Sequence, residues 1–155
     1  MNREEAQNWH PRLMITATDA ALYFLSLDER EAGDVTTNLK LQKLLYYAQG
    51  LHLALHGVPL FSETIEAWSR GPIVPCVYRS FDAITVKGFD PGSIPEPARE
   101  VLDEVHTVYG QFSAWRLREM TQEEPPWRET YQRELPTAEI PHDALVSYFK
   151  TQLVC

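Results

Sequence analysis

The sequence predicts a mainly α-helical fold, a single compact multi-helix domain with a small β element around Thr64-Ser69. Apolar residues recur at three- and four-residue spacing in several segments, which is the pattern of amphipathic helices. Alternation typical of a strand is confined to one short segment. A chain of 155 residues, 44% of them hydrophobic, suits one domain covering residues 1–155.

A first helix is expected from about Leu13 to Leu27, because Ala17, Ala20, Ala21, Phe24 and Leu25 recur at helical spacing. Either Thr16 or Thr18 can cap its N-terminus. The polar segment Asp28 to Asp34 that follows is rich in charge and contains a glycine. Such a composition is typical of a solvated connecting loop.

The segment from Thr36 to Gly57, TTNLKLQKLLYYAQGLHLALHG, is predicted to be the central helix. Thr36 or Thr37 can supply the N-cap oxygen, and Gly57 stands where a left-handed C-terminal glycine is expected. One face collects a core stripe, made of Leu41, Leu44, Leu45, Ala48, Leu51, His52 and Leu55. The other side mixes apolar and polar residues, namely Tyr46, Tyr47, Leu53 and Ala54 among Lys40, Gln42, Lys43 and Gln49. A helix that is apolar nearly all round is usually buried.

After the central helix, the near-alternation of Phe61, Ile65, Ala67 and Trp68 predicts a short strand at Thr64-Ser69. The dipeptide Gly71-Pro72 predicts a turn directly after it. Pro75 can occupy the first turn of the next helix, which would direct Val77, Tyr78 and Phe81 inward. Thr85 to Pro97 is rich in glycine and proline and predicts a loop, with room for a second short strand at 84–86.

The C-terminal half predicts four further helical segments. They run from Pro97 to about Phe112, from Ser113 to Met120, from Pro125 to Glu134, and from Pro141 to the end of the chain. In the second of these, Ser113 is the expected N-cap and Trp115 and Leu117 are expected packing residues. The last helix is expected to bury Leu145, Val146, Tyr148, Phe149 and Leu153.

Charge and hydropathy limit the class of partner. The net charge is −8, from 14 basic and 22 acidic residues, which opposes the counterion release that drives nucleic-acid binding. No apolar run approaches the roughly 20 residues that span a bilayer, and the N-terminus carries no secretory apolar segment. We therefore expect a cytoplasmic protein that binds neither membrane nor, through this chain alone, nucleic acid.

The sequence contains few candidates for catalysis or metal binding. His52 and His56 are one helical turn apart, yet Leu53 stands where a zincin-type site has its glutamate. Cys76, with His106 downstream, lacks any recognisable nucleophile signature, and Cys76 and Cys155 match no metal-ligand spacing. We expect reduced thiols, no cofactor and no metal site. An enzyme or metal protein that uses these side chains is the alternative from another functional class.

Aromatic and cationic side chains are instead the candidates for partner binding. Lys40, Lys43 and Tyr47 fall on one strip of the central helix, and Trp68-Ser69-Arg70 meets Gly71-Pro72. Tyr, Trp and Arg commonly anchor interfaces. The predicted partner-binding set is Lys40, Lys43, Tyr46, Tyr47, Trp68, Arg70, Gly71, Pro72, Tyr78 and Trp127. The alternative is that the aromatics fill the core and the two lysines are solvated.

Three segments resemble the Panacea domain family, the SocA-like antitoxins, which include phage-associated proteins of the GepA type. They are TNLKLQKLLYYAQG at Thr37 to Gly50, PLFSETIEAWSRGPIVPCVY at Pro59 to Tyr78, and YGQFSAWRLREMTQEEPPW at Tyr109 to Trp127. One position departs from the family pattern, since Thr121 is followed by Gln122 where a histidine is common.

The resemblance implies a helical fold with a small sheet and the antitoxin role in a toxin–antitoxin system. It implies a non-enzymatic protein that neutralises a cognate toxin by direct protein contact. A second reading within the same family is a proteolytic adaptor that delivers the toxin to a cytoplasmic protease. Some relatives carry an extra DNA-binding domain, for which this chain has no spare length, so DNA binding is not implied.

Overall fold

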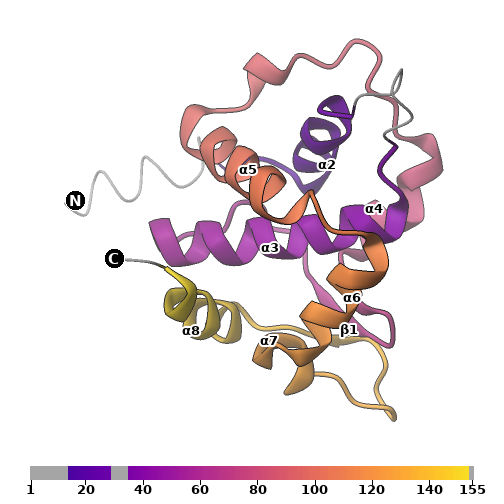
Figure 1. Ribbon diagram of the computed structural model, residues 1–155, viewed down its shortest axis with the longest axis vertical. Helices are drawn as coiled ribbons and strands as arrows, with labels where there is room; N and C mark the ends of the chain where they lie inside the picture. The colour runs from indigo at the N-terminus through magenta and orange to yellow at the C-terminus, as the bar shows by residue number, and fades with distance from the viewer. Residues whose placement is uncertain (1–13, 29–34, 154–155) are drawn as a thin grey trace.

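The computed structural model describes residues 14–28 and 35–153, and it confirms a predominantly helical fold with a small antiparallel sheet (Figure 1). The elements in chain order are α2 (Ala17–Ser26), α3 (Asn38–His56), β1 (Glu66–Trp68), β2 (Gly71–Ile73), α4 (Pro75–Ser80), η2 (Phe81–Ala83), η3 (Pro91–Ser93), α5 (Glu96–Tyr109), α6 (Ala114–Glu123), α7 (Pro125–Arg128), β3 (Ala138–Glu139) and α8 (His142–Gln152). The predicted start of the first helix at Leu13, most of the loop after Asp28, and Cys155 lie outside the described residues.

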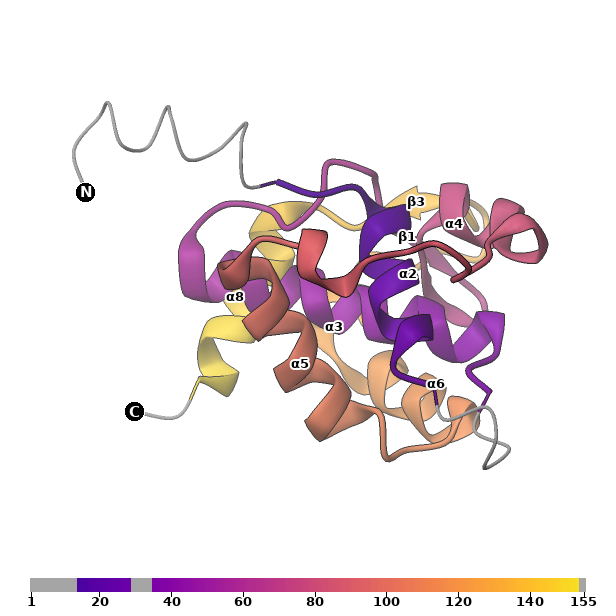
Figure 2. The ribbon, with the colours of Figure 1, turned by 90° about the horizontal axis from the view of Figure 1, so that it is seen from above.

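Helix α3 is the centre of the fold, as predicted. It packs against α2, α5, α6, α8 and β2, with α2 and α5 above it and α8 below it in Figure 1. Thr37 caps its N-terminus by accepting a hydrogen bond from the Lys40 amide, and Gly57 ends it with a φ of 73°. Seen from above, α3 runs through the molecule beneath α2 and α5 (Figure 2).

The β element is a three-stranded sheet with the order β2-β1-β3. The predicted strand is confirmed at β1, but the prediction of a turn at Gly71-Pro72 is wrong. Both residues belong to β2, where Trp68 pairs with Gly71 and Ala67 with Pro72, so the turn falls at Ser69 and Arg70. Pro72 is tolerated because β2 is an edge strand, where a missing N–H costs little.

Two strand assignments also differ from expectation. Ala138 and Glu139 form β3, which pairs with Ala67 and Glu66 of β1 and was not predicted. Within the described residues, 84–86 is not a strand but the exit from the 3-10 turn η2. Short strands of this kind are formed by partners distant in sequence, which local propensity does not report.

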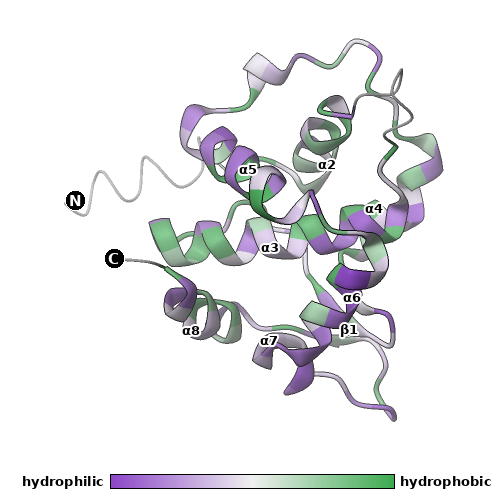
Figure 3. Cartoon of the chain, in the orientation of Figure 1, coloured by the Kyte–Doolittle hydropathy of each residue, from purple (hydrophilic) through white to green (hydrophobic). Residues whose placement is uncertain are grey.

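The core surrounds α3, but two expected core residues lie on the surface. Leu55 is 51% exposed in the last turn of α3, and Trp115 is 63% exposed in the first turn of α6, whereas Leu117 is fully buried. The hydrophobic colouring continues to the C-terminal end of α3, beside α8 (Figure 3). Apolar surface therefore remains uncovered where α3 meets α5 and α8. Among the described residues, no helix is both long and apolar enough to cross a membrane.

Candidate partner-binding site

The polar residues on one side of α3 fasten the segment 58–74 to the helix. Both ends of the Gln49 side-chain amide form hydrogen bonds. Oε1 accepts from the backbone amides of Leu60 (2.7 Å) and Phe61 (3.3 Å), and Nε2 donates to the Phe61 carbonyl (2.8 Å). Gln42 Oε1 accepts from the Val74 amide at 2.8 Å. We call the side of α3 that carries Gln42, Lys43 and Gln49 the clamp side.

Lys43 lies at the centre of the clamp side, fully buried beneath β2. Its Nζ donates to the Pro72 carbonyl at 3.2 Å. Burial, followed by the charge of Arg118, lowers the pKa of the Lys43 ammonium to about 7. Gly71 leaves room for this side chain, since a Cβ at Gly71 would lie 2.8 Å from Lys43 Cε. The lysine is thus part of the packing between α3 and the hairpin.

Next to the clamp side, the face of α3 turned toward α6 and α8 meets a carboxylate. Tyr46 and Tyr47 donate their hydroxyl protons to Glu124 Oε1 (2.9 Å) and Oε2 (2.8 Å), and the hydroxyl of Tyr148 in α8 also favours the ionised form of this carboxyl. Burial raises the pKa of the Glu124 carboxyl to about 7, although the tyrosine hydrogen bonds oppose the shift. The ring of Tyr109 stacks on Tyr47 with a centroid distance of 3.8 Å. We call this the groove side of α3.

Half of the predicted partner-binding residues are therefore not available to a partner in this structure. Lys43, Tyr46, Tyr47, Gly71 and Pro72 are buried. The physical reason is that Lys43 packs against strand β2, to which Gly71 and Pro72 belong, while Tyr46 and Tyr47 hydrogen bond to Glu124. At these five positions the contacts found are those of packing residues, and their part in partner binding stays a prediction. Lys40 is half-buried and lies apart from the hairpin, where its Nζ donates to the Gly110 carbonyl at 2.6 Å.

The remaining four predicted residues gather around β1, and we call them the hairpin face: Trp68, Arg70, Tyr78 and Trp127. The rings of Trp68 and Tyr78 meet edge to face at 5.1 Å, and Trp127 Nε1 donates to the Trp68 carbonyl at 2.7 Å. Arg70 is exposed in the turn between β1 and β2. The structure thus brings together residues from three separate parts of the sequence.

Gln122, which stands where the resemblance noted from the sequence implies a histidine, supports the same hairpin. Its Nε2 donates to the Ser69 carbonyl at 2.8 Å, which ties α6 to the turn that carries Arg70. A side-chain amide donates this bond through its NH2 group, and an imidazole can donate a comparable bond from the ring nitrogen that carries a hydrogen. The substitution therefore preserves a donor at the turn.

The residues considered for catalysis have other contacts. His52 Nδ1 lies 2.8 Å from the Val58 carbonyl, and burial lowers the pKa of the His52 ring to about 4. Cys76 lies at the surface with its thiol partly covered. This partial burial and, to a smaller extent, the charge of Glu63 raise the pKa of the thiol. Within residues 14–28 and 35–153, no three His, Cys, Asp or Glu side chains gather in a way that could hold a metal ion.

Sequence reasoning missed two surface features. Trp115 is the most exposed large hydrophobic residue in the described part of the chain, and the Arg118 guanidinium lies 5.0 Å from its ring centroid. A series of hollows also follows α8, and one of them reaches Glu124. No local signal could have revealed these hollows, because their walls come from α3, α5, α6, α7 and α8.

Comparison with known proteins gives two matches and one absence. A family model described as "Antitoxin SocA-like, Panacea domain" matches residues 41–128. The protein "Antitoxin SocA" of Caulobacter vibrioides (strain NA1000 / CB15N) is 50% identical over 60 residues, which cover 38% of this chain and 32% of that relative. The aligned part is thus about a third of the relative's length. No solved structure matches the chain.

Proposed function

Since this chain belongs to the antitoxin SocA-like, Panacea domain family, we propose that it is an antitoxin that neutralises a cognate toxin by direct protein–protein binding. The observation that carries the proposal is the family match over residues 41–128. That range contains α3 from Leu41 onward, the clamp side and all four residues of the hairpin face. The 50% identity to a protein named Antitoxin SocA supports the same role.

The hairpin face is the surface we propose for the toxin. Trp, Tyr and Arg are the residue types most often found as binding hot spots. The indole N–H groups of Trp68 and Trp127 are held by Glu66 and by the Trp68 carbonyl, so these rings lose little freedom on binding. Arg70 projects from the turn that Gln122 and the clamp side fix in place. The face is therefore rigid before the partner arrives.

The charge of the chain supports a protein partner. With a net charge of −8, binding to duplex DNA at physiological salt is expected to be weak, because phosphate contacts require clustered Lys and Arg. Burial of aromatic anchors depends little on salt. We expect the complex with the toxin to survive about half-molar salt, where the Debye length is only a few Å.

Co-expression with the gene product encoded beside this protein tests the proposal. The wild-type chain should relieve that product's toxicity and co-purify with it at low and high salt. Arg70→Ala should lose both properties while its stability changes by no more than about 0.5 kcal/mol. Lys87→Ala removes an exposed cation from a loop outside the hairpin face and should behave like wild type. Toxicity that the wild-type chain leaves unchanged would overturn the antitoxin role.

Titration of purified components separates direct binding from the alternatives. Sequestration requires at least one antitoxin per toxin, whereas an enzyme would inactivate the toxin at a small fraction of that ratio. Delivery to a protease would shorten the half-life of the toxin in cells, whereas sequestration leaves the toxin present in a stable complex. A short toxin half-life that depends on this chain would therefore favour the adaptor.

A further inference from the structure

Three hollows lie next to one another along α8 and form what we call the α8 groove. The first has a volume of about 520 Å³ and is lined by apolar residues of α3, α5 and α8. The second, of about 380 Å³, opens over Glu124. Tyr109 and Gln152 line both of them. The third, of about 570 Å³, lies between α7 and α8 and shares Tyr148 with the second.

The apolar end of the groove exposes residues that usually pack inside a protein. Leu55 is 51% exposed and Val108 is 38% exposed, and both line the first hollow together with Leu51 and Phe149. Exposed apolar side chains that gather in one depression mark a binding surface more often than scattered ones do. Glu104 lies at the same hollow and is exposed. An apolar floor beside an acidic rim suits an amphipathic, basic segment.

The middle of the groove holds a carboxyl group without a counter-charge. Within the described residues, the groups that act on the Glu124 carboxyl are tyrosine hydroxyls and the like-charged Glu123, none of them a cation. Tyr46 and Tyr47 donate to it, and a carboxylate offers about four lone-pair sites. One more donor can therefore be accepted from the open side, and a charged donor makes the strongest bond.

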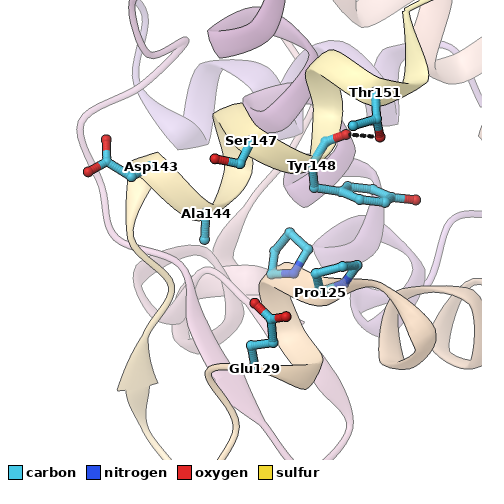
Figure 4. Close-up of a pocket in the computed structure, with 8 residues that line it drawn as sticks. Pro125, Glu129, Asp143, Ala144, Ser147, Tyr148 and Thr151 are labelled. Carbon is cyan, nitrogen blue, oxygen red and sulfur yellow. Dashed lines mark hydrogen bonds between the residues drawn. The ribbon is translucent and has the colours of Figure 1, made fainter.

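The walls of this middle hollow also favour a cation. Tyr109 and Tyr148 line it, and aromatic faces attract ammonium and guanidinium groups. Glu123 adds a second carboxylate. In the third hollow, Ala144 and Tyr148 of α8 lie opposite Pro125 and Glu129, which belong to α7 and the turn after it (Figure 4). The groove thus continues toward α7, which carries Trp127 of the hairpin face.

We propose that the α8 groove binds a basic amphipathic segment of the partner protein, with apolar side chains against Leu55 and Val108 and a Lys or Arg side chain over Glu124. Under the proposed function this partner is the toxin, and the groove extends the surface that begins at the hairpin face. Charge complementarity argues for this occupant, since the chain carries a net charge of −8 and the groove presents Glu104, Glu123 and Glu124. A second copy of this acidic chain would place like charges together.

Fluorescence polarisation with two labelled peptides tests the chemistry on the full-length protein. Both are 14-residue amphipathic helices with leucines on one face, and they differ only in carrying Lys or Gln on the other. The Lys peptide should bind wild-type protein, and the Gln peptide should bind far more weakly. Glu124→Gln should weaken the Lys peptide about tenfold, since it replaces a charged hydrogen-bond partner by a neutral one.

Matched controls distinguish binding in the α8 groove from nonspecific binding to negative charge or exposed apolar surface. Leu55→Asn should weaken binding of the Lys peptide, whereas Val35→Asn changes an apolar residue of at least the same exposure outside the groove and should not. Glu100→Gln removes one exposed negative charge from α5 and should have little effect. Equal affinity of the Lys peptide for wild type, Glu124→Gln and Leu55→Asn would overturn the proposal. Because Leu55 lies outside the network of tyrosines around Glu124, a loss of binding in Leu55→Asn cannot be attributed to disruption of that network.

The pH dependence gives a second readout. A bound cation favours the ionised form of Glu124, so affinity for the Lys peptide should rise between pH 6 and pH 8 in wild type and stay flat in Glu124→Gln. The titratable groups that face Glu124 are Tyr46 and Tyr47 from α3, Tyr109 from α5, Glu123 from α6 and Tyr148 from α8. The tyrosines do not ionise in this range, because burial raises the pKa of each.

The toxin assay distinguishes failure of this inference from failure of the proposed function. If wild type, Glu124→Gln and Leu55→Asn all neutralise the toxin equally, the toxin does not bind in the α8 groove and the antitoxin role stands. If the Lys peptide requires Glu124 and Leu55 but no co-encoded protein is neutralised, the groove binds basic segments and the antitoxin role falls.

Discussion

The two sides of α3 bury ionisable groups in opposite ways. On the clamp side, Lys43 lies in a filled space, beneath Gly71 and against the Pro72 carbonyl. On the groove side, Glu124 is held by tyrosine hydroxyls at the floor of an open hollow. Burial brings the pKa of both groups to about 7. A shifted pKa alone therefore does not mark a binding site, since only one of these two groups can be reached from outside.

The difference also shows how one helix can serve two roles. The clamp side uses side-chain amides to satisfy backbone groups of Leu60, Phe61 and Val74, which lie outside the helices and strands. Buried polar groups are normally accommodated by such hydrogen bonds. The groove side leaves its apolar end and its carboxyl accessible. We interpret the clamp side as the part that builds the hairpin face and the groove side as a surface in its own right.

Removing a glutamine of the clamp side should cause the largest loss of stability. Gln49→Ala leaves three buried backbone groups of Leu60 and Phe61 without their partner, at roughly 1–3 kcal/mol each. We expect the free energy of unfolding to fall by about 3 kcal/mol or more, measured by urea denaturation.

Gln122→Ala is the matched control, because this glutamine also donates to a backbone carbonyl of another segment, but at an exposed site. It should change stability by no more than about 0.5 kcal/mol. If Gln49→Ala and Gln122→Ala lose a similar free energy of unfolding, burial does not make the hydrogen bonds of the clamp side more important for stability.

A smaller loss of stability is expected from a substitution in β2, at the point where this strand lies over Lys43. Gly71 has a φ of 104°, and an added Cβ would lie 2.8 Å from Lys43 Cε and 3.1 Å from Thr121 Oγ1. Gly71→Ala combines a left-handed backbone, at about 1–2 kcal/mol, with overpacking, so we expect a loss of about 2–3 kcal/mol by thermal denaturation.

Gly57→Ala isolates the backbone contribution. Gly57 also has a positive φ, of 73°, but nothing lies within 4 Å of the added Cβ. Its expected cost is about 1 kcal/mol. If Gly71→Ala costs no more than Gly57→Ala, the space around Lys43 is not filled and the contrast between the two sides disappears.

The sequence predicted the helices well because their signals are local. The Thr37 cap, Gly57 and the apolar periodicity of α3 and α5 all lie within the elements they define. Burial of polar side chains was not predicted, because Gln49 and Lys43 are explained only by backbone groups 11 to 29 residues away. The sequence made Lys43 and Tyr47 candidates for partner binding, and the structure buries both side chains.

The groove was beyond sequence reasoning for the same reason. Tyr47, Tyr109, Glu124 and Tyr148 converge on one point from four helices or helix ends, and no spacing in the sequence indicates this. Trp115 and Leu55 were expected in the core from their residue type, yet both are more than half exposed. Apolar type predicts burial on average, and the exceptions here lie where a helix end is left uncovered.

The smallest expected effect is the change of stability with pH, which has opposite sign for Glu124 on the groove side and Lys43 on the clamp side. Burial raises the pKa of Glu124, so the folded chain binds a proton that the unfolded chain has lost between about pH 4.5 and 7. Its contribution to stability is present at low pH and is lost as pH rises through about 7. Lys43 has a lowered pKa, so between about pH 7 and 10.5 the unfolded chain binds the extra proton and stability rises with pH.

Differences between variants isolate these two contributions from those of other groups, including His52, whose pKa is also lowered by burial. Relative to Glu124→Gln, wild type should lose about 1 kcal/mol of stability between pH 5 and pH 8, less than the full shift implies because Glu124 is partly exposed. Relative to Lys43→Met, wild type should gain at least as much between pH 7 and pH 10, since Lys43 is fully buried. Urea denaturation across this pH range measures both differences. Slopes of the same sign would mean that one of the two groups is paired with an opposite charge in solution, and the contrast between a filled and an open side of α3 would then need another explanation.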